Sequence, residues 1–167
     1  MDNLFNTLQL TEKIILNPGN FENIDLLVKN KLQKKIGNKC NKDGYVLANS
    51  IKILKRSIGK VNTSFFDGSI SYNLEYSASI CNPKEGSIIN VKYVDHNKMG
   101  ILAKKNGTPL NIVIPKQLHK NKELFKEIDD RLKNNNDINL KIQVIGKRYE
   151  KDDKEIFVIG KLLNILQ

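Results

Sequence analysis

The hydrophobic residues of the first half follow a strand pattern and then a helix pattern. Residues 10–16, LTEKIIL, alternate loosely and predict a strand that ends at Pro18 and Gly19. After Asn23, apolar side chains recur three and four residues apart, at Ile24, Leu27, Val28, Leu32 and Ile36. Lysines occupy the opposite face, so this stretch predicts an amphipathic helix that stops at Gly37 and Asn38.

Two further strands are predicted before residue 82. The stretch after residue 44 favours strand through Tyr45, Val46, Leu47, Ile51, Ile53 and Leu54. Asp67-Gly68 is a hairpin-type turn signal. The residues after it place apolar or aromatic side chains at period two, at Ile70, Tyr72, Leu74 and Tyr76. That alternation predicts a half-buried strand of an antiparallel sheet.

The second half reads as three strands, a helix and two more strands. Turns at residues 95–98, at Asn106-Gly107 and at Asp152-Asp153 separate the predicted strands, which cover 87–94, 99–105, 110–115, 138–150 and 155–166. Residues 120–134 form a charged segment with helical spacing of Leu124, Phe125, Ile128 and Leu132. This order matches the OB-fold, a small five-stranded barrel that often binds single-stranded nucleic acid.

The segment ASICNPKEGSIINVKY, residues 78–93, contains the break between the halves. Pro83 lacks an amide donor, and Gly86 adopts backbone conformations that other residues resist. These residues fit a hairpin turn within one sheet as well as a domain seam. The changed order of elements after Gly86 favours a seam, with residues 1–82 and 83–167 as separate domains. Only about four residues join them, too few for a flexible tether, so the two domains should be held nearly rigid.

Amino-acid composition restricts the possible functions of the protein less than the pattern of hydrophobic positions does. The chain has 167 residues and a net charge of +10, almost all of it from lysine. A basic balance favours a nucleic-acid partner, but Lys, Asn and Ile have AT-rich codons, so genomic bias and a solvated basic surface remain alternatives. Cys40 and Cys81 form no CxxC pair, which favours free thiols in a reducing compartment.

Catalytic and targeting signals are not apparent in the sequence. His96 and His119 lack metal-site spacing, the acidic residues of 120–134 favour ion pairing with nearby lysines, and no GxxxxGK[ST], GxSxG or GxGxxG occurs. We therefore expect no cofactor, no metal and no active site. The N-terminus lacks a signal-peptide pattern and no run is long enough for a membrane helix, so we expect a soluble intracellular protein without a membrane partner.

Three stretches, in this order and spacing, resemble a known family. They are the strand-helix opening LTEKIILNPGNF with Gly44-Tyr45-Val46 after it, the stretch GKVNTSFFDGSISYNLEY, and the break itself. In the second, Gly59, Lys60, Val61, Asp67, Gly68, Tyr72 and Tyr76 fit the family pattern. In the third, Pro83, Glu85 and Gly86 match a Pro-x-x-Gly-Glu-like junction, with Glu and Gly in reverse order here. The family is the stalk subunit of multisubunit DNA-dependent RNA polymerases, which includes the seventh subunit of RNA polymerase II and its archaeal counterpart.

The resemblance covers nearly the whole chain and implies a fold, partners and a location. It implies an α+β protein with an N-terminal RNP-like tip domain (strand-helix-strands) that docks on the polymerase core, followed by a five-stranded OB-fold barrel that approaches exiting RNA. Its partners would be the large core subunits and a fourth-subunit-like stalk protein. The Lys-, Asn- and Ile-rich composition would suit a giant DNA virus version. The location would then be the nucleus or, if viral, a cytoplasmic viral factory and the virion.

Two sets of residues are the candidate sites. Core docking would use the loops around residues 58–66 and 41–44, with Lys60, Val61, Phe65, Phe66, Asp67 and Gly68. Adjacent Phe residues in a polar loop are typical of interface anchors, although they could instead fold back onto their own sheet. RNA contact would use cations and flat side chains of the barrel, namely Lys92, Tyr93, His96, Lys98, Lys104, Lys105, Lys116, Lys147, Arg148 and Tyr149.

The expected RNA contact is weak, sequence-independent and sensitive to salt. Where many RNA-binding OB domains carry Phe-Gly-aromatic, this chain has Met99-Gly100-Ile101, which makes the stacking platform thin. The lysines could also be merely solvent-facing. Two other classes stay open: a free-standing single-stranded nucleic-acid-binding or translation-associated OB protein, which would not need the N-terminal docking half, and an enzyme with an unrecognised site.

Overall fold

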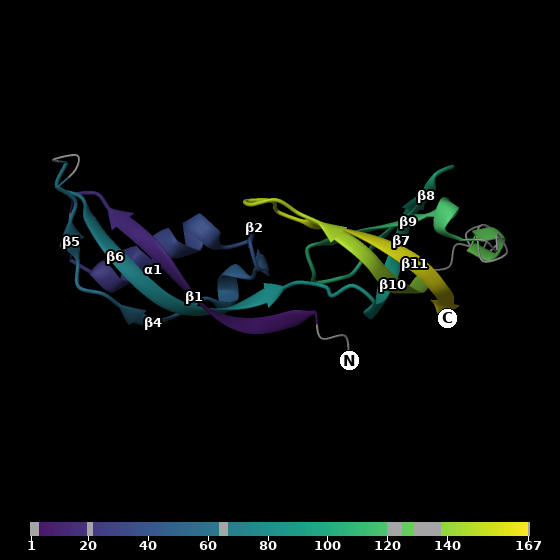
Figure 1. Ribbon diagram of the computed structural model, residues 1–167, viewed down its shortest axis with the longest axis horizontal. Helices are drawn as coiled ribbons and strands as arrows, with labels where there is room; N and C mark the ends of the chain where they lie inside the picture. The colour runs from purple at the N-terminus through teal and green to yellow at the C-terminus, as the bar shows by residue number, and fades with distance from the viewer. Residues whose placement is uncertain (1–3, 20–21, 64–66, 120–124, 129–137, 167) are drawn as a thin grey trace.

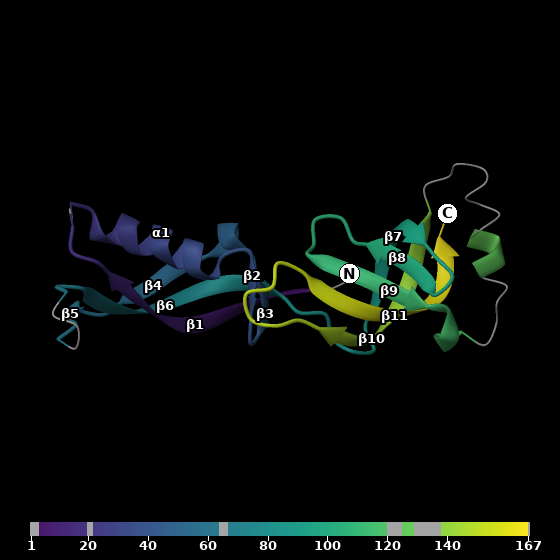
Figure 2. The same ribbon diagram turned by 90° about the horizontal axis from the view of Figure 1, so that it is seen from above.

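The fold is α+β, with strands predominating in two separate sheets (Figure 1). The computed structural model describes residues 4–19, 22–63, 67–119, 125–128 and 138–166. A six-stranded sheet and helix α1 form the N-terminal part, and a closed five-stranded β-barrel forms the C-terminal part. The two parts lie end to end along the long axis of the molecule (Figure 2).

Two long strands form the backbone of the N-terminal sheet. Strand β1 (Phe5–Leu16) runs antiparallel to β6 (Ile70–Cys81) over its whole length. The shorter strands β3, β4 and β5 pair with β6, and β2 extends the sheet by pairing with β3. Their bounds are β2 (Lys39–Asn41), β3 (Gly44–Val46), β4 (Lys52–Arg56) and β5 (Lys60–Val61). The predicted alternation of β6 is confirmed, because Tyr72, Leu74 and Tyr76 are buried while Asn73 and Glu75 are exposed.

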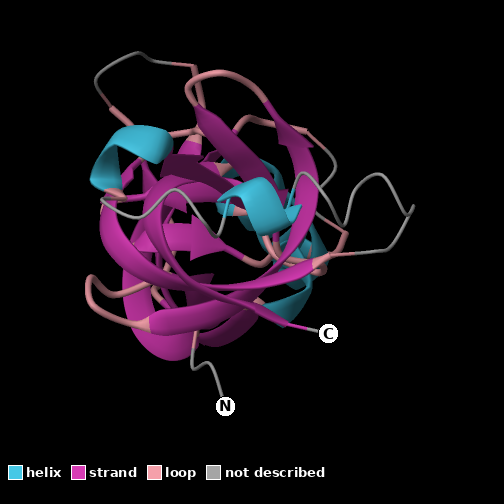
Figure 3. Ribbon diagram, turned by 90° about the vertical axis from the view of Figure 1, so that its right-hand side faces the viewer, coloured by secondary structure: helices cyan, strands magenta, loops and turns pink. Residues whose placement is uncertain are grey.

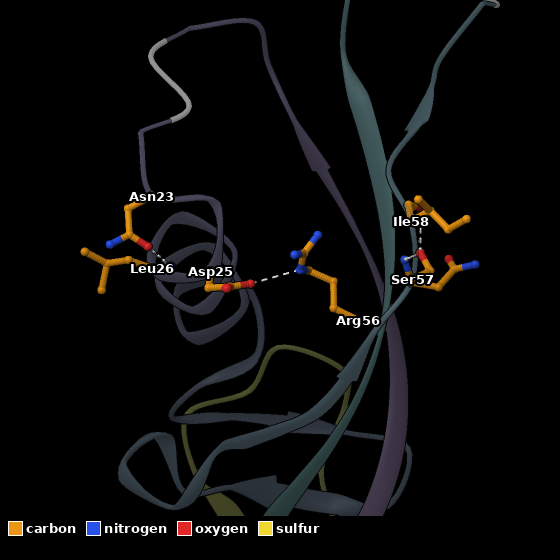
Figure 4. A network of polar contacts seen from close by, with 7 residues as sticks. Asn23, Asp25, Leu26, Arg56, Ser57 and Ile58 are labelled. Carbon is orange, nitrogen blue, oxygen red and sulfur yellow. Dashed lines mark hydrogen bonds and ion pairs between the residues drawn. The ribbon is translucent and has the colours of Figure 1, made fainter.

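Helix α1 (Ile24–Ile36) agrees with the predicted helix at both ends. The Asn23 side chain accepts a hydrogen bond from the Leu26 amide at 3.4 Å, which caps the first turn (Figure 4). At the other end Asn38, with φ of 54°, takes the left-handed conformation that ends the helix. Val28 and Leu32 are fully buried and join the core formed by the apolar face of β6.

The sequence predicted one continuous strand after residue 44, and this prediction is wrong. A 3-10 turn, η1 (Ala48–Ser50), divides it into β3 and β4. The Ser50 hydroxyl donates to the Leu47 carbonyl at 2.7 Å and accepts from the Ser79 amide at 2.8 Å. Because this side chain takes over a hydrogen bond that a continuous ladder would have made, the chain turns between two segments that both favour strand.

The C-terminal strands close into a barrel (Figure 3). Around the barrel the strand order is β10-β11-β9-β8-β7. Their bounds are β7 (Ile88–His96), β8 (Gly100–Lys104), β9 (Leu110–Pro115), β10 (Asn139–Arg148) and β11 (Ile156–Leu166), with a 3-10 turn, η2 (Lys116–Leu118), after β9. Strands β9 and β11 are parallel, and the other neighbours are antiparallel. The five predicted strands are thereby confirmed, and the barrel is OB-like in form.

The predicted helix over 120–134 lies mostly outside the described residues. Residues 125–128 are helical, and Phe125 and Ile128 are buried in the barrel core. The rings of Phe125 and His119 pack in a T-shaped arrangement, with their centres 5.1 Å apart.

The break at residues 82–87 is a passage between sheets, because β6 and β7 pair within different sheets. Gly86 has φ of 81°. The turn between β10 and β11 extends from the barrel to β2 (Figure 2). There Cys40 donates from its amide to Asp153 at 2.7 Å and accepts from the Asp152 amide at 2.9 Å. The side chains of Cys40 and Cys81 are packed in the barrel core as free thiols.

Candidate nucleic-acid interface and docking surface

The outer side of the barrel over β8, β9, β11 and β10 carries a continuous apolar row. Leu102 on β8 pairs with Val113 on β9, and Val113 pairs with Ile159 on β11. Ile159 pairs in turn with Gly146 on β10. Val113 is 39% exposed and Ile159 is 47% exposed. Alternation along each strand sends the intervening side chains into the core, so this row points outward.

A second row beside the first carries positive charge around an aromatic ring. Successive register pairs join Lys92 to Lys104, Lys104 to Asn111, Asn111 to Phe157, and Phe157 to Arg148. The Phe157 ring is 52% exposed. We call the two rows together the barrel face. Cations on both sides of an exposed ring are the combination that single-stranded nucleic acid requires.

Phe157 was missed by the sequence interpretation, because the local sequence does not show which face of its strand it lies on. In EIFVIG the apolar run is continuous, so period-two alternation does not distinguish inside from outside. The structure buries Ile156 and Val158 and leaves Phe157 on the outer side. The neighbouring strand order, which brings Arg148 and Lys104 to either side of it, cannot be read from local sequence.

Hollows lie at both ends of the barrel face. One, of about 430 Å³, adjoins the turn between β7 and β8, and its lining includes His96, Met99, Leu102, Val113 and Pro115. The Asn97 side chain fixes this turn by accepting from the amides of Met99 at 2.9 Å and Gly100 at 3.1 Å. The other, of about 580 Å³, adjoins the turn after β10, and its lining includes Arg148, Tyr149, Phe157 and Ile159. In an OB barrel these two turns border the ligand face.

The predicted RNA-binding residues divide between this face and other places. Lys92, Lys104 and Arg148 lie in the charged row, and His96 lines the first hollow with its Nδ1 2.6 Å from the Tyr93 hydroxyl. Lys98 and Lys105 lie in turns that flank β8. Lys116 lies over the Phe125 ring at 5.7 Å.

Lys147 and Tyr149 are engaged at the junction between the two parts. Lys147 Nζ donates to the Pro83 carbonyl at 3.0 Å and to the Asn82 side chain. The Tyr149 hydroxyl donates to the Lys42 carbonyl at 3.4 Å. Burial is the main cause that raises the Tyr149 pKa, with nearby Cys40 and Asp43 adding to it. In this arrangement both side chains bind the protein itself rather than point along the charged row.

The far end of the N-terminal sheet presents the predicted docking residues. Here Ile58 is 87% exposed and Val61 is 64% exposed. Lys60 is exposed beside Val61 in β5, and the Asp67 carboxylate accepts from the Ser69 amide at 2.9 Å, which lowers the Asp67 pKa. We call Ile58, Lys60, Val61, Asp67 and Gly68 the tip surface. Phe65 and Phe66 lie outside the described residues.

The loop that carries Ile58 is held in place by its neighbours (Figure 4). The Ser57 amide donates to the Asn73 carbonyl at 2.9 Å, and the Ser57 hydroxyl accepts from the Asn73 amide at 2.9 Å. One residue earlier, Arg56 pairs with Asp25 of α1 at 2.9 Å. The backbone next to Ile58 is therefore held while its apolar side chain is exposed, and the sequence interpretation had not singled this residue out as an anchor.

No protein-family model matches the chain. Within the described ranges, no three His, Cys, Asp or Glu side chains gather as a metal site would require. None of the described helices is both long and apolar enough to cross a membrane.

Proposed function

We propose that this protein is a non-catalytic stalk subunit of a DNA-dependent RNA polymerase. In this proposal the N-terminal sheet with α1 is an RNP-like tip domain that docks on the large core subunits. The barrel is an OB-fold that contacts exiting RNA. The observation that carries the proposal is the two-part architecture: a strand-helix-strand sheet joined by a short break to a closed five-stranded barrel, in the order that the family resemblance implies.

The tip surface supports the docking half of the proposal. Ile58 and Val61 are exposed aliphatic side chains at the end of the sheet, where a protein partner would cover them. The open face of the same sheet is polar, with Asn73 and Glu75 exposed and Ser77 and Ser79 partly so. An RNP-type sheet that binds RNA carries aromatic side chains there. These features favour a protein partner at the tip over an RNA partner.

The barrel face supports the RNA half of the proposal. Its charged row supplies cations for phosphates and one ring, Phe157, for stacking. With a single ring, contact should be weak and independent of sequence. A fourth-subunit-like partner remains part of the proposal by family resemblance.

Affinity purification tests the docking claim. A tagged double variant, Ile58→Ser with Val61→Ser, should lose co-elution of the polymerase large subunits from the native source, while the free chain keeps its circular dichroism spectrum. Met99→Ser is the matched control, because Met99 is also 78% exposed but lies on the barrel. Undiminished co-elution of the double variant would refute docking through this surface. Failure of the wild-type chain to recover any polymerase subunit would refute the whole proposal and favour a free-standing OB protein.

A further inference from the structure

Strand β1 forms an edge of the N-terminal sheet. It pairs with β6 on one side, and within the described residues no strand pairs with it on the other side. By contrast, the barrel is closed, and the edge at β2 is covered where Cys40 bonds to the turn after β10. A row of unpaired amides and carbonyls along a strand is a template on which another strand can add.

The outward-facing backbone groups of β1 can be identified from its partner strand. Asn73 of β6 directs both its amide and its carbonyl to Ser57, on the side of β6 away from β1. Its partner on β1, Lys13, therefore also faces away from β6, and its carbonyl accepts from Lys35 Nζ at 3.0 Å. Because these directions alternate along a strand, the other outward-facing residues are Phe5, Thr7, Gln9, Thr11 and Ile15.

Only part of this edge is open to another strand. The Lys13 carbonyl is occupied by Lys35, whose ammonium also pairs with Glu12 at 2.5 Å. Charged side chains at a sheet edge are a common protection against pairing. From Phe5 to Thr11, in contrast, the strand carries no charge and no proline, and its register with β6 is unbroken. The usable edge is therefore residues 5–11.

We propose that this edge binds the same edge of a second copy of the chain, antiparallel, in a symmetric dimer. A second copy supplies a strand that is free, uncharged and regular over the same residues. The two-fold axis that uses every free group from Phe5 to Thr11 sets Leu8 opposite Leu8 of the second copy. In this register Thr7 and Gln9 lie opposite each other and exchange both backbone hydrogen bonds.

The side chains at this register favour it. Leu8 is 37% exposed, so the pair at the axis covers an apolar side chain on both copies. Since Leu8 faces its backbone toward β6, the pair is of the non-hydrogen-bonded kind, in which side chains are closest. The chain has a net charge of +10, which opposes self-association in general. A contact over uncharged residues, ending before Glu12 and Lys13, avoids like charges at the ladder.

The dimer contact goes beyond the proposed polymerase role. It uses main-chain groups of β1, which belongs to neither the tip surface nor the barrel face. A single short ladder lies at the small end of interface sizes, below roughly 1,200 Å² in total, so we expect a weak and reversible dimer. Its test requires only the purified full chain, so its outcome is separate from that of co-elution with a polymerase.

Hydrogen exchange followed by NMR locates the contact. The amides of Thr7, Gln9 and Thr11 should gain protection of roughly tenfold or more between dilute and concentrated protein, because exchange then requires the dimer to open. The Ile15 amide also faces outward but lies beyond residues 5–11, so its exchange should not change. Unchanged exchange at all three amides, or an equal gain at Ile15, would overturn the proposal.

Sedimentation velocity on the full chain measures the dimer itself. Leu8→Lys places two like charges side by side at the axis and should abolish dimer formation with rising concentration. Ile15→Lys is the matched control, because Ile15 is 39% exposed on the same strand, and it should dimerise as the wild type does. A Leu8→Lys chain that dimerises normally would contradict the contact. A wild type that stays monomeric to roughly 1 mM would leave the edge to a strand of another protein and equally overturn the proposal.

Cysteine crosslinking is an independent test should Leu8→Lys not fold. Opposite residues of an antiparallel pair lie within disulfide reach, so Leu8→Cys should form a covalent dimer on mild oxidation. Thr11→Cys is the control, because two copies of Thr11 stand about six residues apart along the ladder, roughly 20 Å. Equal crosslinking of both variants would indicate random collision, and faster crosslinking of Thr11→Cys a different register. Either result would refute the proposed dimer.

Discussion

Phe157 is the residue on which the proposed RNA contact at the barrel face most depends. It is exposed on β11 between Arg148 and Asn111, and beyond Asn111 lies Lys104. Phe157→Ala should weaken binding of a short single-stranded RNA roughly fivefold or more, since stacking on a ring contributes about 1–3 kcal/mol per base. A gel-shift titration at low salt measures the change.

Phe157→Leu is the informative companion to that variant. It keeps apolar volume at the site but removes the aromatic face. If Leu binds RNA as tightly as Phe, the ring acts by burial and not by stacking. If neither variant changes the affinity, the bases do not contact this face.

The two cysteines give a prediction that depends mainly on their burial. Desolvation by burial, with Asp153 adding to it, raises the Cys40 pKa to about 11, and burial raises the Cys81 pKa to about 12, with Cys40 adding to it and Lys105 opposing it. A thiol with so high a pKa stays protonated and is a poor nucleophile. A thiol-disulfide reagent at about pH 8 should therefore titrate neither cysteine in the native protein and both in denaturant. Rapid labelling of native protein would show that the junction opens.

The sequence identified the candidate cations of the barrel, but it could not show which of them lie on the barrel face and which lie elsewhere. Lys104 and Lys147 are equivalent as letters in the sequence, yet one lies in the charged row and the other is bonded to the Pro83 carbonyl. What distinguishes them is strand register and the position of the junction, both of which are non-local. Phe65 and Phe66 stay a prediction.

The charged row of the barrel face is an element-scale feature, because its members come from all five strands of the barrel. Three cations of this row, Lys92, Lys104 and Arg148, are in a position to neutralise about three phosphates. For single strands the salt slope is about −0.7 per phosphate, which predicts a slope of log K against log salt near about −2. Lys104→Met should lower its magnitude by about 0.7. Lys141→Met, on an exposed position of β10 outside the row, is the control. A slope that does not change on Lys104→Met would exclude this row as the phosphate track.

Strand β8 begins with a glycine that packing requires. A Cβ at Gly100 would stand 2.4 Å from the Ile114 carbonyl oxygen and 3.0 Å from Pro115 Cα, both backbone atoms of the paired strand. Gly100→Ala should therefore lower the free energy of unfolding by about 1–3 kcal/mol, as overpacking does. At Gly146 of the same barrel a Cβ meets nothing within 4 Å, so Gly146→Ala should be neutral or slightly stabilising. Urea denaturation of both variants measures the difference, and equal stabilities would contradict the close approach.

At the element scale the sequence predicted most of the strands, α1 and the barrel. Strand β9 and helix α1 have the predicted bounds because their periodicity is unbroken. Strand β1 begins at Phe5, earlier than predicted, because pairing along all of β6 extends a stretch whose own pattern is polar. The break at Ser50 and the short strands β2 and β5 depend on side-chain and long-range hydrogen bonds, which local propensity does not encode.

At the scale of the whole molecule, the junction decides whether the two parts move together. The short break could have been a hinge. Instead Lys147 reaches from β10 to the Pro83 carbonyl and the Asn82 side chain, and Asn82 donates in turn to the Asp43 carbonyl. The turn after β10 adds two backbone hydrogen bonds to Cys40. The stalk role that we propose would need such a connection between the two parts.

Lys147→Met tests this connection because it removes the ammonium group while keeping most of the aliphatic stem. Hydrogen bonds from a charged group contribute about 1–3 kcal/mol, so the free energy of unfolding should fall by about that much. The barrel core does not include Lys147, so the barrel itself should stay folded. Small-angle scattering should then record a broader distribution of maximum dimensions, and residual dipolar couplings should require two alignment tensors where the wild type fits one. The Lys141→Met control on the same strand should fit one tensor. If Lys147→Met also fits one, the backbone bonds between Cys40 and the turn after β10 are enough to keep the parts rigid, and the lysine serves stability alone.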